Sequence, residues 1–410
     1  MDGERLTSMT RRTLLRSAPA AGIVMTASSW SRVLGANDRI QLGAIGPGVR
    51  GRYVLEGFLK DPAVDVRALC DVWSSQIDEA LRIAPKAKGY RDHRKMLESE
   101  KLDAVLVSTP DHWHAPLAIE ALNAGLHVYV EKPLTLTMAE GPAIVRAARV
   151  NKRVCQVGTQ ARSAGHFQRL KREYFDTRKL GKITLVRTWY NGNRYHFRRA
   201  PDSLRQQPDN LDWARFLGPV KWRDWDSQQY WNWRAYLDFG GGQIGDLFVH
   251  LVDVVHMLLG HDLPVSATAA GGIYHYKDGR TAPDTITVAL EYPGEFVVTF
   301  EGSLAPGSQG AGLEFCGTEG RLHIDWPSRG GAMFHSAERN TQPVEALPPG
   351  PDATADHVRN FLDCARSGIL PNADAHIGHR SAQAAHLGKI AYLEQRRIRF
   401  DPVREQILPL

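Results

Sequence analysis

The segment IQLGAIGPGVRG (residues 40–51) joins an apolar run to a set of closely spaced glycines. The run from Ile40 to Ile45 predicts a buried β-strand. Gly46, Gly48 and Gly51 then fit the spacing GxGxxG, which permits a tight turn and a close approach of the backbone to a diphosphate. The diphosphate rests on the N-terminus of the helix that follows. The segment therefore predicts a strand–turn–helix unit that binds a dinucleotide.

The next predicted strand ends beside an acidic residue. Val64–Cys70 reads as a strand, and Asp71 follows it about 20 positions after Gly51, where a carboxylate hydrogen-bonds the ribose 2′-hydroxyl. Because a carboxylate repels a 2′-phosphate, we expect NAD as the cofactor, with NADP the less favoured alternative. Arg50 or Arg52 would weaken that preference.

Strand-like runs alternate with helical patterns up to Val157, which is typical of a parallel, doubly wound sheet. The strands expected there are Ile40–Ile45, Val64–Cys70, Ala104–Ser108, His127–Val130 and Val154–Val157. After Gly158 the expected strands are Ile183–Tyr190, Ser266–Ile273, Thr285–Tyr292, Phe296–Gly302, Leu313–Cys316 and Arg321–Asp325, with helices near Gln243–Leu259, Asp356–Ser367 and Gly378–Gln395. We predict an α/β protein with an N-terminal Rossmann domain (residues 37–157) and a C-terminal α/β domain (residues 158–410). The second domain is expected to hold a mostly antiparallel open sheet and to bind substrate.

The composition is that of a globular protein. The 410 residues are 43% hydrophobic and 23% charged, with a formal net charge of +6, and this length suits two domains. The sequence has no basic stripe with interleaved aromatic residues, so nucleic acid is not an expected partner. The four cysteines lie far apart without a CxxC pair and are expected to be buried free thiols.

Residues 1–36 are expected to be an export signal. The run TRRTLLR at residues 10–16 resembles a twin-arginine motif, and a weakly apolar stretch follows from Ser17 to Ser29. That stretch is too short to serve as a stable membrane anchor. We therefore expect export of the folded protein, for example to the periplasm, with cleavage near Ala27 or Ala36. A basic, disordered N-terminus is the alternative.

Three further motifs accompany the glycine turn. STPDHWH (residues 108–114) and EKP (residues 131–133) follow buried strands, and GGGQIGDLFVHLVD (residues 240–253) lies downstream. Together the motifs resemble the glucose–fructose oxidoreductase and inositol dehydrogenase family (Gfo/Idh/MocA) over essentially the whole mature chain. With the glycine motif, the resemblance implies that the cofactor is bound by Gly46, Gly48, Val49, Arg50, Gly51, Asp71, Thr109, Pro110, His114, Glu131 and Lys132.

The residue types also fit alcohol oxidation, which needs a base for the hydroxyl proton and a positive charge for the developing alkoxide. Lys132 leaves the carboxyl end of a strand, where open α/β sheets bind ligands. Asp246 and His250 are spaced i, i+4 and share one face of a predicted helix. The resemblance implies that these three residues are catalytic. A helix-internal pair that only satisfies itself is the alternative for Asp246 and His250.

Aromatic, Arg and Asn residues gather at 187–199 and 230–234, a composition suited to stacking on sugar C–H surfaces and binding hydroxyls. The residues expected to bind substrate are His112, Arg194, His196, Trp231, Arg234 and His250. Trp213 and Trp222 are expected to be structural. Asp253 and His256 continue the face of Asp246 and His250 and raise a metal site as an alternative. No metal is expected, because no further ligand motif is present.

The expected function is hydride transfer between NAD(H) and a hydroxyl of a sugar, glycoside or polyol. Free NAD is scarce outside the cytoplasm, so an exported enzyme would hold its cofactor and recycle it. One alternative is an NAD-dependent glycosidase that works by transient oxidation and elimination with bound cofactor. A second is a non-catalytic sugar or nucleotide sensor, which would have no need of Lys132 or the Asp246/His250 pair. Since family members often associate through the open sheet, we expect a homo-oligomer.

Overall fold

The computed structural model describes residues 39–192, 200–260, 263–308, 310–326, 331–339 and 343–409. Ile40–Leu410 form one compact unit, and the description below concerns that unit. Within the described residues, no helix is both long enough and apolar enough to cross a membrane. The expected signal segment lies outside these residues.

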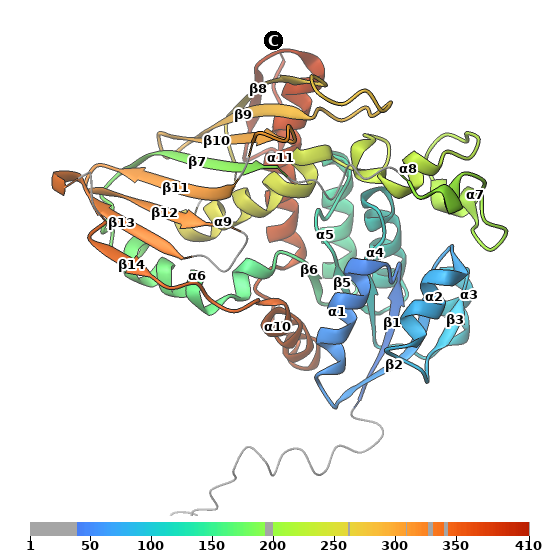
Figure 1. The fold of residues 1–410 in the computed structure, drawn as a ribbon. Coiled ribbons are helices and arrows are strands. Elements are labelled where there is room, and N and C mark those ends of the chain that lie inside the picture. The colour runs from blue at the N-terminus through green and yellow to red at the C-terminus, as the bar shows by residue number, and fades with distance from the viewer. Residues whose placement is uncertain are drawn as a thin grey trace, which may run out of the picture. The chain divides into compact units, whose positions relative to one another are not determined.

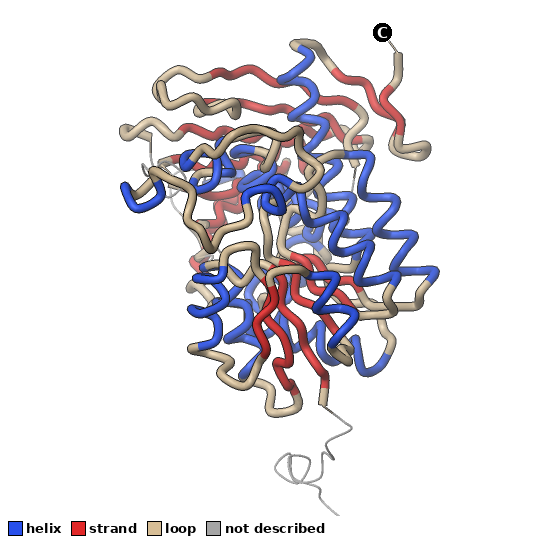
Figure 2. The backbone as a smooth tube through the Cα atoms, turned by 90° about the vertical axis from the view of Figure 1, so that its right-hand side faces the viewer, coloured by secondary structure: helices blue, strands red, loops and turns tan. Residues whose placement is uncertain are grey.

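The first half of the unit is a six-stranded sheet in which every pair of neighbouring strands is parallel. Its strands and helices alternate along the chain as β1 (Ile40–Ile45), α1 (Val49–Leu59), β2 (Val64–Cys70), α2 (Ser74–Leu81), β3 (Lys88–Tyr90), α3 (His93–Ser99), β4 (Ala104–Val107), α4 (His114–Asn123), β5 (His127–Val130), α5 (Gly141–Val150) and β6 (Cys155–Val157). The spatial order is β3-β2-β1-β4-β5-β6, which is the doubly wound arrangement of a Rossmann domain. This confirms the predicted parallel sheet, and Figure 2 shows its strands side by side.

The order of the strands reverses between β1 and β4, and the carboxyl ends of both strands open there. Ligands of such sheets bind at this reversal point. The sequence had not predicted β3, which is short and carries an exposed Lys88 and a glycine in place of an apolar run. Cys70, Cys155 and Cys364 are buried, Cys316 is half-buried, and all four are free thiols, as expected.

The second half is built on a ten-stranded sheet in the order β14-β13-β12-β11-β7-β10-β9-β8-β15-β16. Its strands are β7 (Ile183–Asn191), β8 (Ser266–Gly272), β9 (Thr285–Tyr292), β10 (Phe296–Ser303), β11 (Ala311–Gly317), β12 (Gly320–Asp325), β13 (Ala332–Ser336), β14 (Glu345–Leu347), β15 (Ile398–Asp401) and β16 (Gln406–Ile407). Neighbouring strands in the described residues are antiparallel except β7 and β10, which run parallel. The predicted α/β fold with a mostly antiparallel second sheet is thereby confirmed.

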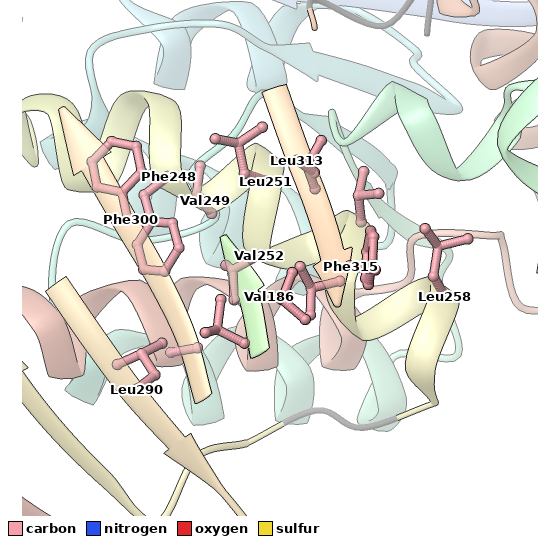
Figure 3. Close-up of a cluster of buried hydrophobic side chains, with 14 of the residues drawn as sticks. Val186, Phe248, Val249, Leu251, Val252, Leu258, Leu290, Phe300, Leu313 and Phe315 are labelled. Atoms are coloured by element: carbon pink, nitrogen blue, oxygen red, sulfur yellow. The ribbon is translucent and has the colours of Figure 1, made fainter. Parts of the chain in front are cut away.

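Helices cover one face of this second sheet (Figure 1). They are α6 (Gly165–Leu170), α9 (Val249–Leu259) and α11 (Ala375–Glu394). Apolar residues of α9 pack against apolar residues of the strands, as Figure 3 shows for Val249, Leu251, Val252, Val186, Leu313 and Phe315. Phe248, which precedes α9, stacks on Phe300 with ring centroids 4.8 Å apart. This packing fixes the start of α9, where two of the predicted catalytic residues lie.

The chain returns to the Rossmann sheet near its end. Helix α10 (Thr354–Ser367) contributes Val358, Phe361 and Leu362 to the apolar core that also contains Phe58 and Tyr129. The Rossmann core is therefore completed by residues from the last part of the sequence. The predicted domain limits at residues 36 and 157 stay predictions.

Residues 200–239, which we name the cap, form a small cluster of short helices. These are η8 (Asp202–Leu204), α7 (Trp213–Leu217), α8 (Ser227–Trp231) and η9 (Trp233–Ala235). Trp213, Phe216 and Phe239 are buried in the cap's own core. Trp213 is structural, as expected, whereas Trp222 is 64% exposed and the expectation that it is structural is wrong.

Candidate active site

The glycine turn after β1 has the geometry that a dinucleotide requires. Gly46 has a φ of +75°, a conformation that favours glycine. A Cβ on Gly51 would lie 2.3 Å from Ser108 Oγ and 2.8 Å from the Gly46 carbonyl oxygen, so α1 packs against the glycine turn and the residue after β4 only with glycine at that position. A Cβ on Gly48 would meet no protein atom closer than 4.0 Å and would stand in the open cleft.

The N-terminus of α1 is open to a ligand. Gly48 is its N-cap, and no side chain caps the helix. Val49 begins the helix with its side chain 82% exposed, although it lines the cleft. Uncapped amide groups at a helix N-terminus bind phosphate, and an exposed valine beside them offers apolar surface to a cofactor. These residues fit the pyrophosphate of a dinucleotide.

Asp71 lies at the carboxyl end of β2, at the edge of the same cleft. Its Oδ1 accepts a hydrogen bond from the backbone N–H of Trp73 at 2.9 Å. Burial raises the pKa of Asp71 to about 7, opposed by the Trp73 N–H and by the charge of Arg52. Arg52 donates to the Pro47 carbonyl and to Gln76. The carboxyl group is thus positioned for a ribose hydroxyl, with its charge sensitive to pH near neutrality.

The loops after β4 and β5 are joined through His114. Its Nδ1 lies 2.6 Å from the Pro133 carbonyl oxygen and its Nε2 lies 2.9 Å from the Thr109 carbonyl oxygen. Glu131 accepts hydrogen bonds from Arg50 Nε at 3.0 Å and Gln160 Nε2 at 3.1 Å. Thr109, His114, Glu131 and Arg50 all line the cleft, where these contacts hold the strand ends in place.

Lys132 and Asp246 meet at the centre of the cleft. Lys132 Nζ donates to Asp246 Oδ1 at 2.5 Å and to the Asp246 carbonyl oxygen at 2.9 Å. Arg234 Nε donates to the same Oδ1 at 3.2 Å, and its guanidinium lies 4.1 Å from the centroid of the Trp233 ring. One carboxylate therefore orients two cations that come from the loop after β5 and from the cap.

Asp246 belongs to a π-helical turn, η10 (Ile244–Phe248), and His250 lies in the first turn of α9 directly after it. Burial, together with the charge on Lys132, holds the pKa of His250 well below its usual range. Among the described residues, none hydrogen-bonds to the His250 ring, which lies 5.9 Å from the Trp326 ring between centroids. The imidazole is consequently neutral near pH 7 and available to accept a proton.

The loop that carries Lys132 is supported from the second domain. Lys389 Nζ on α11 donates to the Leu136 carbonyl oxygen at 2.6 Å, and Thr135 Oγ1 lies 3.1 Å from His386 Nε2. Because α11 also packs against the second sheet, it fixes the position of the Lys132 loop relative to α9.

A single cleft of about 1510 Å³ joins these elements. It is large enough for a dinucleotide together with a small substrate. Of the predicted site residues, those lining it are Gly46, Gly48, Val49, Arg50, Asp71, Thr109, Pro110, His114, Glu131, Lys132, Trp231, Arg234, Asp246 and His250. The structure thus brings the predicted cofactor positions and the predicted catalytic positions together.

His112 does not line this cleft, and its predicted role in substrate binding is wrong. The side chain is 2% exposed and lies between Phe216 and Phe239 of the cap core. Its Nε2 lies 2.8 Å from the Phe216 carbonyl oxygen, and burial lowers its pKa to about 4. In the short turn Asp111–Trp113, His112 lies buried while Asp111 and Trp113 line the cleft. The remaining predicted substrate residues, Arg194 and His196, lie outside the described residues.

The possible metal face does not form either. Asp253 accepts from Arg162 Nε at 2.9 Å and from Ser381 Oγ at 2.7 Å. His256 Nε2 lies 2.7 Å from the Tyr292 hydroxyl. Among the described residues, no group of His, Cys, Asp and Glu is arranged to hold a metal ion. The side chains of Asp253 and His256 therefore support the fold.

Asp111, Tyr190 and Trp326 also line the cleft and were not predicted as site residues. Asp111 is 3% exposed, and its Oδ2 accepts from the Gly241 N–H at 3.2 Å. Burial raises the pKa of Asp111. The STPDHWH motif was the available signal for Asp111, and the aromatic stretch 187–199 was the signal for Tyr190. Trp326, which directly follows β12, belongs to no motif.

Comparison with known proteins agrees with this geometry. Residues 40–159 match the model of the oxidoreductase family with an NAD-binding Rossmann fold, and residues 216–323 match the GFO/IDH/MocA C-terminal domain. The first match confirms the predicted NAD-binding Rossmann domain, which is of the oxidoreductase family.

The chain is 30% identical over 154 residues to the alpha-N-acetylgalactosaminidase of Shewanella oneidensis, a match that spans 34% of each protein, about a third of the relative's length. Two solved structures share the fold. The aldose-aldose oxidoreductase of Caulobacter crescentus, complexed with glycerol, is 18% identical with a TM-score of 0.69 and covers 88% of this chain and 100% of its own. The WlbA dehydrogenase of Bordetella pertussis, in complex with NADH and UDP-GlcNAcA, is 18% identical with a TM-score of 0.66 and covers 91% and 99%.

Proposed function

We propose that this chain, which carries both domains of the GFO/IDH/MocA oxidoreductase family, transfers hydride between NAD(H) and a hydroxyl-bearing carbon of a sugar, glycoside or polyol. The observation that carries the proposal is the contact of Lys132 with Asp246, beside His250, in the cleft that also contains the glycine turn. Hydride transfer from an alcohol requires a cation for the alkoxide and a base for the proton beside the dinucleotide, and Lys132 and His250 are these two groups.

Lys132 and His250 act on the substrate hydroxyl, and Asp246 orients Lys132. Lys132 has three N–H groups, and two of them donate to Asp246, so the third remains for the oxygen of the reacting hydroxyl. The ammonium stabilises negative charge on that oxygen as it develops. His250, which is neutral, accepts the hydroxyl proton. A dinucleotide held by the glycine turn and Asp71 would supply the hydride acceptor for the oxidation and the hydride donor for the reverse reaction.

The first test is the identity of the nucleotide that the purified mature protein carries. We expect mass spectrometry of the denatured protein to find NAD or NADH in near-stoichiometric amount, because a recycled cofactor has to remain bound. NADP in its place would contradict the assignment of Asp71. A protein that neither carries nor binds NAD, or that turns over no sugar, polyol or glycoside with NAD supplied, would overturn the proposal.

A glycosidase is the second candidate, and a specific observation favours it. The relative from Shewanella oneidensis bears the name alpha-N-acetylgalactosaminidase. Transient oxidation of a glycoside hydroxyl to a ketone acidifies the adjacent C–H, the aglycone leaves by elimination, water adds, and the ketone is reduced back. That cycle needs a further acid or base, and the Asp111 carboxyl, buried with a raised pKa in the cleft, is a suitable group.

Assays without added cofactor distinguish the two candidates. We would offer the protein aryl N-acetyl-α-galactosaminides and simple sugars or polyols in separate reactions. Release of the aryl alcohol without net NADH formation supports the glycosidase. Net NADH formation, or coupled oxidation of one sugar and reduction of another, supports the dehydrogenase.

Export through the twin-arginine pathway belongs to the same proposal. It is supported by the run TRRTLLR at residues 10–16 and by the compact unit beginning at Ile40, so that cleavage after Ala36 would leave that unit whole. Replacing Arg11 and Arg12 by Lys is expected to keep the full-length precursor in the cytoplasm. Cell fractionation and N-terminal sequencing would check this.

We also propose that the protein forms a homo-oligomer through the face of the second sheet that the helices leave uncovered. The alternation along β9 supports it, since Ile286, Val288 and Leu290 are buried and the intervening residues are more exposed. Light scattering of the mature protein would give its mass, and a monomer would contradict the proposal.

A further inference from the structure

The cap is hydrogen-bonded to the loops that follow three strands of the Rossmann sheet, β2, β3 and β4. Beyond β2, the Asp212 N–H donates to the Val72 carbonyl oxygen at 2.9 Å. Beyond β3, Arg215 pairs with Asp92 at 3.1 Å. Beyond β4, Trp113 Nε1 donates to the Phe216 carbonyl oxygen at 2.9 Å. Val72, Asp92, Trp113, Arg215 and Phe216 all line the cleft, so the cap supplies part of its wall beside Asp71.

Asn210 makes the densest of these attachments. Its Oδ1 accepts from Trp73 Nε1 at 2.9 Å, and its Nδ2 lies 2.9 Å from Ser74 Oγ and 3.1 Å from Ser75 Oγ. Its carbonyl oxygen accepts from the Ser74 N–H at 3.1 Å. Every hydrogen-bonding group of the side chain amide thus contacts the three residues that begin α2.

Those three residues begin two positions after Asp71, the carboxylate placed to bind the ribose. The Trp73 N–H donates to Asp71 Oδ1, so the backbone of Trp73 fixes the orientation of that carboxyl group. Asn210 holds Trp73 through its indole and Ser74 through its backbone and hydroxyl. A single amide side chain from the cap therefore acts on Asp71 through one intervening residue.

We propose that Asn210 is a positioning residue for the nucleotide: by holding the loop after Asp71 against the cap, it slows release of the dinucleotide and sets the preference for NAD over NADP. The proposal rests on the NAD-binding domain and on these contacts, and it does not depend on which sugar chemistry the enzyme performs. Its failure and the failure of the proposed function are therefore distinguishable.

The test compares Asn210→Ala with the parent protein, using nucleotide binding as the readout. We expect NADH to dissociate about tenfold faster and ADP-ribose to bind about tenfold more weakly, because several hydrogen bonds to the loop after Asp71 are lost. Nicotinamide mononucleotide, which does not reach Asp71, should bind within about twofold of the parent. The ratio of NAD to NADP affinity should fall by about threefold or more.

Gln207→Ala is the matched control. Gln207 Nε2 donates to the Leu211 carbonyl oxygen, so this change removes a hydrogen bond inside the cap and leaves the contacts of Asn210 in place. We expect the nucleotide affinities of this variant to match the parent. A loss of NADH retention as large as that of Asn210→Ala would overturn the specific role of Asn210.

Trp73→Phe gives a second, milder measurement. It removes the Nε1 donor and keeps an aromatic ring against Tyr230. We expect NADH dissociation to be faster and the ratio of NAD to NADP affinity to be lower, both by less than in Asn210→Ala. If Asn210→Ala does not fold, these two measurements on Trp73→Phe test the proposal. Unchanged NADH dissociation and an unchanged NAD to NADP ratio in the variants that fold would overturn the proposal, even with a lower melting temperature, because the contacts would then serve stability alone.

Discussion

The nucleotide side of the cleft and the substrate side are built in different ways. On the nucleotide side, a glycine turn and a single carboxylate follow β1 and β2, and much of the binding surface is backbone. On the substrate side, Lys132, Asp246 and Arg234 come from three separate segments and meet through charged hydrogen bonds. The glycine turn and Asp71 of the first side are encoded locally, although the cap supports the loop after Asp71, whereas the second side exists only once the two sheets and the cap have assembled.

The two sides also differ in what a substitution removes. Backbone amides at the start of α1 remain whatever the side chain, so the nucleotide side is disturbed mainly by added bulk. The substrate side depends on particular charges, and loss of one charge leaves its partner unpaired. The predictions below test this contrast, beginning with the largest effect.

Lys132→Met removes the ammonium and keeps most of the side chain's length. We expect turnover to fall by about a thousandfold, because the charge that stabilises the developing alkoxide is lost. NAD affinity should change far less, as measured by titration of the nucleotide-free protein. Lys86→Met, at an exposed position, is the control. Turnover close to that of the parent would place the chemistry elsewhere in the cleft.

Asp246→Asn and Asp253→Asn should give opposite results, although both residues belong to the same helical segment. Asp253 is fully buried against Arg162, and its neutralisation should lower the free energy of unfolding by about 3 kcal/mol. Turnover per folded molecule should change little. Asp246→Asn should cost less stability, because Lys132 and Arg234 keep access to the cleft, and should reduce turnover by about a hundredfold. Urea unfolding and steady-state assays measure the two quantities, and matching behaviour of both variants would contradict the division of roles.

Gly48→Ala and Gly51→Ala separate ligand contact from protein packing. A Cβ on Gly48 meets only open cleft, so we expect NAD to bind at least about tenfold more weakly while the melting temperature of the nucleotide-free protein is unchanged. A Cβ on Gly51 collides with Ser108 and with the Gly46 carbonyl oxygen, and this variant should lose about 1–3 kcal/mol of stability as well. Gly165→Ala, with nothing within 4 Å, is the control. Unimpaired NAD binding by Gly48→Ala would refute the pyrophosphate site.

The smallest effect concerns pH. Since burial raises the pKa of Asp71 to about 7, its carboxyl group is largely neutral below that pH and largely ionised above it. The ionised form repels a 2′-phosphate, so the preference for NAD over NADP should increase by up to about tenfold between about pH 6 and about pH 8. Asp71→Asn should make this ratio independent of pH. Affinities for both nucleotides, measured across that range, should give a ratio of NAD to NADP affinity that rises with pH in the parent and stays constant in Asp71→Asn. A ratio that falls with pH in the parent would exclude the carboxylate as the discriminating group.

Much of the Rossmann half could be predicted from the sequence, for a physical reason. Buried parallel strands need continuous apolar runs, and such runs mark β1, β2, β4, β5 and β6. The edge strand β3 has polar residues and a glycine, so its three residues become a strand only through pairing with β2. Strands β13 to β16 are likewise short, and β15 depends on pairing with β8, which lies far away in the sequence.

The sequence predicted which residues belong to the site, but it did not predict the side-chain contacts between them. Nothing in the local pattern indicates that Lys132 would donate to Asp246. His112 and His114 stand two residues apart in one motif, and only the packing of the cap decides that His112 is buried in its core. Asn210 belongs to no motif, and its contacts depend on the chain crossing back over the start of α2.

Helix α10 has a consequence for the order in which the protein can fold during synthesis. The Rossmann segment leaves the ribosome first, yet Phe58 and Tyr129 pack against Phe361, which is made more than two hundred residues later than either of them. Until α10 emerges, that apolar surface lacks the residues that cover it in the structure. A fragment that stops after β6 should therefore be poorly soluble, and cofactor loading should await completion of nearly the entire polypeptide.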